Sequence, residues 1–118
     1  MVKDLNYFII KGIQELKGED IVLIDLSKLS NTICDYFIIC HGNSSTHVNS
    51  IIQSVAREVR EGLKVHEGHT EGFENAQWML IDYFNTVVHV FQRPTREYYR
   101  LEDLWADGIT KKITTIYN

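Results

Sequence analysis

One short segment of this sequence comes close to a metal-binding pattern. His66-Glu67-Gly68-His69 has the residue types of the helical zinc-protease motif. That motif needs histidines at positions i and i+4, because this spacing brings both imidazoles to the same ion. Here the histidines are three positions apart with a glycine between them. We therefore expect an exposed loop over residues 65–75 that binds no structural metal.

The two cysteines do not form a redox or disulfide pattern. Cys34 and Cys40 are too few for the disulfide framework of a small secreted domain, and no CxxC is present. An even spacing within a strand over residues 34–40 would put both on one face. We expect two buried structural thiols. The sequence shows no signal peptide and no apolar run long enough to span a membrane, which predicts a cytoplasmic protein.

Serines and a glycine mark the junction between a strand and a helix. Ser44 and Ser45 follow Gly42, but no Gly-x-Ser-x-Gly nucleophile motif is present, and N-capping of a helix explains them. A nucleotide phosphate bound near Gly42 and Ser44 is the alternative, since free N–H groups at such a turn can hold an anion.

The strand carboxylates do not form a two-metal catalytic site. Such a site needs acidic residues on alternate positions of one strand. Asp25, Asp35 and Asp82 have no acidic residue two positions further on. This argues against polymerase-like catalysis whatever the fold. With no nucleophile motif and no metal-ligand spacing elsewhere, we expect no catalytic residues, no cofactor and no enzymatic activity.

Composition indicates one globular domain over residues 1–118. Hydrophobic residues make up 44% and charged residues 24% of the chain, enough for one core. The net charge of −4 disfavours binding to nucleic-acid phosphates by bulk electrostatics but is compatible with a basic protein partner.

Hydrophobic periodicity predicts the order α-β-β-α-β-β-α, hence an α/β or α+β fold with a small mixed sheet flanked by helices. The expected helices cover residues 5–16, 45–63 and 98–105, and the expected strands cover residues 21–26, 34–40, 78–82 and 86–91.

The last two strands form a hairpin by their spacing. With Tyr83 and Phe84 as a two-residue loop, Trp78 would face His89. A two-residue loop of this kind demands positive φ, which a bulky Phe84 disfavours. The core face would hold Met79, Ile81, Val88 and Val90, and the other face would hold Trp78, Leu80, Asp82, Val87, His89 and Phe91. That second face is either a partner surface or lies beneath a helix, and His89 fits either reading.

Three blocks of the chain resemble the ribosomal silencing factor family, also called the Iojap-like proteins. They are residues 35–48, residues 78–82 with 87–91, and residues 96–105, and the resemblance extends from Leu16 to Trp105. It implies a fold related to nucleotidyltransferases that lacks their catalytic carboxylates. It also implies a translational repressor that binds the large ribosomal subunit through its protein number fourteen and blocks joining of the small subunit when nutrients are short.

The resemblance favours a partner surface on the hairpin. It assigns partner-binding roles to Trp78, Asp82, Tyr83, Arg96 and Tyr99. We add Phe84, because a strained aromatic residue kept at the tip of a turn suggests that its ring contacts the partner. The sequence departs from the family pattern at His41, where threonine is usual, and at Phe84, where glycine is usual. An exposed aromatic face also predicts a possible homodimer. The alternative from another class is a degenerate nucleotidyltransferase that still binds a nucleotide.

Overall fold

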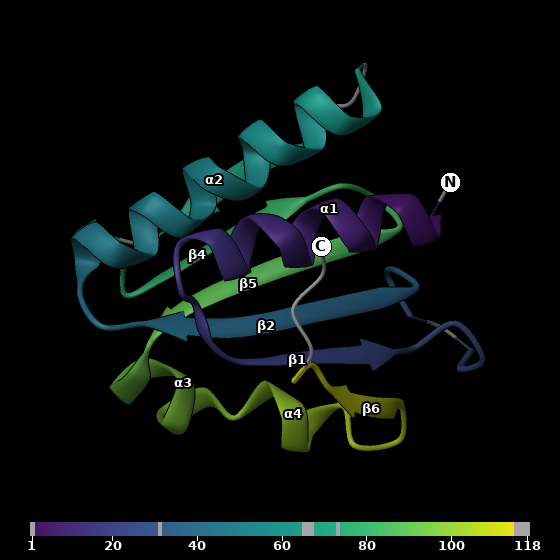
Figure 1. Ribbon diagram of the computed structural model, residues 1–118. Helices are drawn as coiled ribbons and strands as arrows, with labels where there is room; N and C mark the ends of the chain where they lie inside the picture. The colour runs from purple at the N-terminus through teal and green to yellow at the C-terminus, as the bar shows by residue number, and fades with distance from the viewer. Residues whose placement is uncertain (1, 31, 65–67, 73, 115–118) are drawn as a thin grey trace.

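Six strands form one mixed sheet in the computed structural model, which describes residues 2–30, 32–64, 68–72 and 74–114 (Figure 1). Across the sheet the strand order is β3-β4-β5-β2-β1-β6. The central strands β2 and β5 are parallel, and every other neighbouring pair is antiparallel. The strands are β1 Glu19–Asp25, β2 Tyr36–Gly42, β3 His69–Gly72, β4 Trp78–Asp82, β5 Thr86–Gln92 and β6 Ile109–Lys112.

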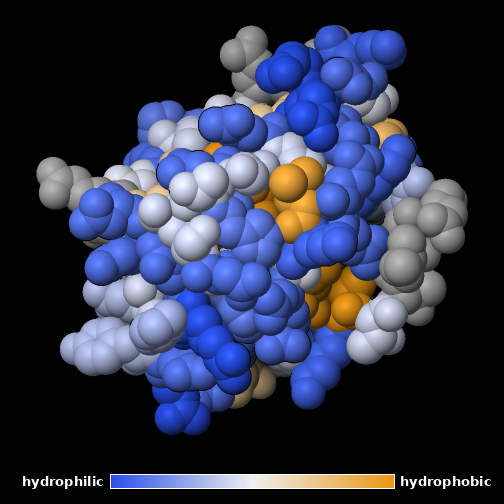
Figure 2. Space-filling model, turned by 60° about the vertical axis from the view of Figure 1, so that its left-hand side comes forward, coloured by the Kyte–Doolittle hydropathy of each residue, from blue (hydrophilic) through white to orange (hydrophobic). Residues whose placement is uncertain are grey.

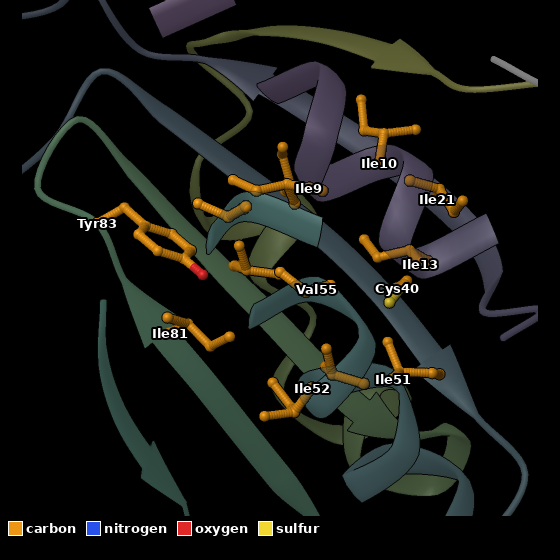
Figure 3. Close-up of a cluster of buried hydrophobic side chains, with 14 of the residues drawn as sticks. Ile9, Ile10, Ile13, Ile21, Cys40, Ile51, Ile52, Val55, Ile81 and Tyr83 are labelled. Carbon is orange, nitrogen blue, oxygen red and sulfur yellow. The ribbon is translucent and has the colours of Figure 1, made fainter. Parts of the chain in front are cut away.

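Helices lie on both sides of this sheet. The long helices α1 (Val2–Glu15) and α2 (Ser45–Leu63) pack side by side over one face (Figure 1). Their apolar stripes meet the sheet in the larger core, where Ile9, Ile51 and Ile81 are almost fully buried (Figure 3). The short helices α3 (Arg93–Tyr99) and α4 (Leu101–Leu104) follow β5, and a smaller core forms on the second face around Phe37, Ile39 and Phe91.

The contact between α1 and α2 is close because Gly12 has no side chain. A Cβ atom on Gly12 would lie 2.7 Å from the Cα atom of Val55. The hydroxyl of Ser54 donates a 2.8 Å hydrogen bond to the Gly12 carbonyl across the same contact. The two helices therefore touch backbone to backbone at this point.

The α+β prediction with a mixed sheet flanked by helices is confirmed. Four strands and the first two helices match the sequence prediction to within a few residues. Two strands were missed, because β3 and β6 are four residues each and fully exposed, without an alternating apolar pattern. β3 replaces part of the loop predicted over residues 65–75, and residues 65–67 and 73 of that loop lie outside the described residues.

The single helix predicted over residues 98–105 is wrong. A helix, α3, already begins at Arg93, and Pro94 stands in its first turn, where its missing N–H costs nothing. Arg100 adopts a left-handed conformation with φ of 50° and separates α3 from α4.

Both cysteines are buried, as predicted, but they do not share a face of one strand. Cys34 precedes β2 and lies in the smaller core, whereas Cys40 lies within β2 in the larger core. The spacing argument failed because Cys34 is not part of the strand. Burial raises the pKa of the Cys34 thiol to about 11 and that of Cys40 to about 12.

Substitution of Gly12 by alanine tests the close helix contact. Overpacking of this kind typically costs 1–3 kcal/mol, and alanine's better helix propensity recovers up to about 1 kcal/mol. We expect Gly12→Ala to lower the free energy of unfolding by about 1 kcal/mol in urea denaturation.

Gly62→Ala is the matched control, because its new Cβ would meet only the half-buried ring of Phe8, which can rotate. An equal or larger loss in Gly62→Ala would contradict this account of the α1–α2 contact.

Candidate partner-binding surface

The hairpin of β4 and β5 turns one residue later than its sequence suggests. Tyr83 and Thr86 close it, with a 2.9 Å hydrogen bond from the Tyr83 N–H to the Thr86 carbonyl, so Phe84 and Asn85 form the loop. Trp78 is paired with Phe91 rather than with His89. The predicted register is thus wrong by two positions. A shift of two keeps every side chain on its face, and the predicted division between the two faces holds.

Trp78 lies half-buried at the open side of the second sheet face. Its ring centroid is 4.8 Å from that of Phe91 and 4.9 Å from that of Tyr99 on α3. The indole Nε1–H donates a 3.1 Å hydrogen bond to Nδ1 of His89. Leu80, the next residue on this face of β4, is also half-buried. Tyr99 is 48% exposed, so this aromatic group extends to the surface.

His89 belongs to the core beneath Trp78 rather than to the surface. It is 6% exposed, and its ring packs edge-on against Phe37 at 4.8 Å. Because Nδ1 accepts from Trp78, the neutral ring carries its hydrogen on Nε2, which is buried without a partner among the described residues. Burial lowers the pKa of His89 to about 4. The imidazole is therefore neutral at pH 7 and fixes the orientation of Trp78.

The tip of the hairpin exposes an aromatic ring on strained backbone. Phe84 is 85% exposed and has a φ of 73°, a conformation that L side chains rarely adopt. A 2.9 Å hydrogen bond from the Asn85 N–H to the Tyr83 carbonyl closes a tight turn around it. The carboxylate of Asp82 accepts the Phe84 N–H at 2.8 Å and holds this turn. The predicted positive φ is confirmed for Phe84 but not for Tyr83.

Acidic and apolar groups from the neighbouring strand join this tip. The Asn85 side chain donates a 3.4 Å hydrogen bond to Asp35, which precedes β2, and Asp35 follows the 81% exposed Ile33 by two positions. Asp35 and Asp82 both act on the Cys34 thiol through their charge. Within the described residues, neither carboxylate has a Lys or Arg partner. We call Ile33, Asp35, Asp82 and Phe84 the hairpin tip.

Two residues predicted for the surface are buried instead. Tyr83 is 2% exposed and points into the larger core beside Ile81 (Figure 3), where burial raises its pKa to about 12. Alternation along β4 places Tyr83 on the face opposite Trp78, which the prediction overlooked. Arg96 is 8% exposed, and its guanidinium contacts Glu102 at 2.6 Å and Nδ1 of His41 at 2.9 Å. The hairpin tip and the Trp78 group are thus available for contact without these two side chains.

The junction before α2 uses its polar groups internally. Ser44 caps α2, its hydroxyl accepting the His47 N–H at 3.1 Å. The N–H of Asn43 donates to Nδ1 of His47 at 2.9 Å, and a Cβ on Gly42 would meet the same ring at 3.0 Å. His47 therefore occupies the place that a phosphate near Gly42 and Ser44 would take.

The described part of the chain contains neither a metal-binding cluster nor a membrane-spanning helix. No three His, Cys, Asp or Glu side chains there are grouped so as to hold a metal ion. No helix there is both long and apolar enough to cross a bilayer. Of the motif examined above, His66 and Glu67 lie outside the described residues.

Comparison with known proteins identifies the family. Residues 3–117 match the family model described as ribosomal silencing factor during starvation. The ribosomal silencing factor RsfS of Bacillus subtilis is 43% identical over 97 residues, which cover 78% of this chain and 76% of the relative. That of Halalkalibacterium halodurans is 36% identical over 112 residues, covering 94% and 93% respectively. The chain belongs to the ribosomal silencing factor family, and the resemblance noted from its sequence is confirmed.

Solved structures agree with this assignment. A crystal structure of a Chromobacterium violaceum protein superposes with a TM-score of 0.83 at 27% identity, covering all of this chain and 93% of that one. A Bacillus halodurans structure superposes with a TM-score of 0.75 at 32% identity, covering 96% and 99%. The mixed sheet with its flanking helices is therefore shared with solved proteins.

Replacing Phe84 by glycine should stabilise the isolated protein. Glycine adopts positive φ without strain, and relief of about 1–3 kcal/mol exceeds the added entropy of the unfolded chain, about 0.4–1 kcal/mol. We expect Phe84→Gly to raise the free energy of unfolding by about 1 kcal/mol in urea denaturation. Asn85→Gly is the control, because Asn85 in the same turn lacks positive φ. Stabilisation of both variants, or of neither, would contradict the strain argument.

The buried His89 should make stability depend on pH. Its pKa is about 4 in the folded state against 6.5 ordinarily, so between these values the unfolded chain binds more protons. Stability therefore falls as the pH is lowered from 6.5 to about 4, by about 3 kcal/mol from this group. Chemical denaturation at several pH values should show that the free energy of unfolding falls less steeply with decreasing pH in His89→Leu than in the wild type. The exposed His69 provides the control, and the same shallower slope in His69→Gln would refute the assignment to His89.

Proposed function

We propose that this protein represses translation by binding the large ribosomal subunit through its protein number fourteen. The small subunit docks on the same face of the large subunit, so the bound protein blocks joining by steric exclusion. The consequence is lower translation under nutrient limitation, in the cytoplasm. Membership of a family described as silencing factors during starvation supports this proposal.

One observation carries the choice of surface. The aromatic rings of Trp78 and Tyr99, with the neighbouring Leu80, lie partly exposed on the second sheet face. Trp78, Leu80 and Asp82 occupy alternate positions of β4 on this face. Large aromatic side chains at the centre of an interface contribute much of its binding energy. The hairpin tip adds the exposed ring of Phe84 and the carboxylates of Asp35 and Asp82, which have no Lys or Arg partner among the described residues.

The charge of this surface fits a ribosomal protein. Such proteins are generally basic, and the net charge of −4 together with the carboxylates at the tip favours their encounter. Steric exclusion requires affinity but no bond making or breaking, so no catalytic residue is needed. Two copies that pair through the same aromatic face would cover it. In this scheme a homodimer would therefore be an inactive form that cannot bind the ribosome.

Co-sedimentation with free large subunits tests the proposal. We expect the wild-type protein to sediment with large subunits at moderate salt and Trp78→Ala to lose about 2 kcal/mol or more of binding energy. Phe84→Gly should also bind more weakly although its fold is more stable, which separates a contact role from a folding role.

Ile109→Ala is the control, because Ile109 is 61% exposed on the far edge strand β6. Absence of the wild-type protein from the large-subunit fraction would sink the proposal. Unchanged binding of both Trp78→Ala and Phe84→Gly, with cooperative melting retained, would move the interface elsewhere.

A further inference from the structure

A cavity of about 620 Å³ opens at the end of the sheet opposite the hairpin tip. It lies where the parallel strands β2 and β5 end, at His41 and at the start of α3, and the N-terminal part of β1 forms another wall. In Figure 2 this end of the molecule is turned forward, and hydrophilic residues predominate on its surface. The carboxyl ends of parallel strands are where open sheets commonly bind ligands, and the volume suits a small molecule.

Cations from two separate segments converge on this cavity. Arg93, Arg96 and Arg100 come from α3 and its end, and Lys112 comes from the edge strand β6. Arg96 is held rigidly, because its guanidinium donates to Glu102, to the carbonyl of Glu19 and to His41. The cavity therefore has a buried guanidinium at its base, paired with Glu102, and more exposed cations around it.

The carboxylates of the cavity leave donors free for a ligand. Arg93 contacts Glu97 at 3.2 Å and Arg100 contacts Asp103 at 2.7 Å, each with more than 60% of both side chains exposed. Exposed ion pairs of this kind contribute little stability, and each guanidinium has five N–H donors. Lys112 has no acidic partner among the described residues. A multivalent anion can therefore engage these three cations together.

The remaining walls suit a sugar and a base. Asp20 also lacks a cationic partner within the described residues and can accept hydrogen bonds from ribose hydroxyls. Ile21, Val22 and Ile113 supply apolar area. We infer that this cavity binds a nucleoside diphosphate or triphosphate, with its phosphates on Arg93, Arg100 and Lys112. The site is separate from the junction at Gly42 and Ser44, which His47 fills.

Calorimetric titration of the isolated protein tests this inference directly. ATP, GDP and inorganic pyrophosphate are the probes, each with and without Mg²⁺. We expect saturable one-to-one binding of at least one nucleotide, tighter than pyrophosphate and weakened by added salt. Lys112→Gln should weaken it roughly tenfold to a hundredfold, the effect of one charge-assisted hydrogen bond.

Lys111→Gln is the matched control, because Lys111 neighbours Lys112 on β6 but does not line the cavity. Its affinity should equal that of the wild type. Absence of nucleotide binding, equal loss in both lysine variants, or pyrophosphate binding as tightly as nucleotides would each overturn the inference. Binding of a single-stranded RNA oligomer without binding of mononucleotides would assign these cations to nucleic acid instead. None of these outcomes depends on ribosome binding.

Discussion

The parallel pairing of β2 with β5 is the constraint on which the rest of this structure depends. Parallel neighbours cannot be joined by a tight turn, so the chain between them crosses over the sheet as α2 and then forms β3 and β4. α2 needs a partner of its own, and Gly12 lets α1 approach it closely enough to close the larger core. The second sheet face is covered by the short segments that follow β5 and by residues of the connection between β1 and β2.

The pairing of β2 with β5 also positions both regions at which we propose binding, which are the hairpin tip and the cavity at the other end of the two strands. At the start of the two strands, Asp35 lies beside Asn85, so the exposed ring and the carboxylates of the hairpin tip are held in one place by hydrogen bonds. At their carboxyl ends, His41 lies next to the start of α3, which brings Arg96 into the sheet. α3 carries Arg93 and Arg96 of the cavity and also Tyr99, which packs on Trp78.

The parts of the fold that sequence could predict are those with a strong apolar period. The stripe along α2 and the continuous apolar runs of β2 and β5 are signals of burial that tertiary context did not override. β3 and β6 carry no such signal, since their pairing rests on backbone hydrogen bonds at the sheet edges. The break between α3 and α4 at Arg100 could not be predicted either. A left-handed backbone at an arginine is stabilised by its surroundings rather than by the intrinsic preference of the residue.

The sequence predicted which sheet face each hairpin residue occupies, but not how deeply the candidate surface residues are buried. Period-two alternation separated Trp78 from Ile81 correctly even with the register wrong by two positions. Nothing local revealed that Arg96 is buried, since its contacts with His41 and with the Glu19 carbonyl join segments that are distant in the sequence. His89 was ambiguous for the same reason: its burial depends on Phe37, a residue of another strand.

Subunit joining followed by light scattering tests the central claim most directly. Purified large subunits are incubated with increasing amounts of the protein before small subunits are added, and the scattering increase on joining is recorded. Our account predicts that joining falls in proportion to the occupied large subunits, and that preincubation with small subunits has no effect. Joining that proceeds at the same rate and extent with every large subunit occupied would contradict it.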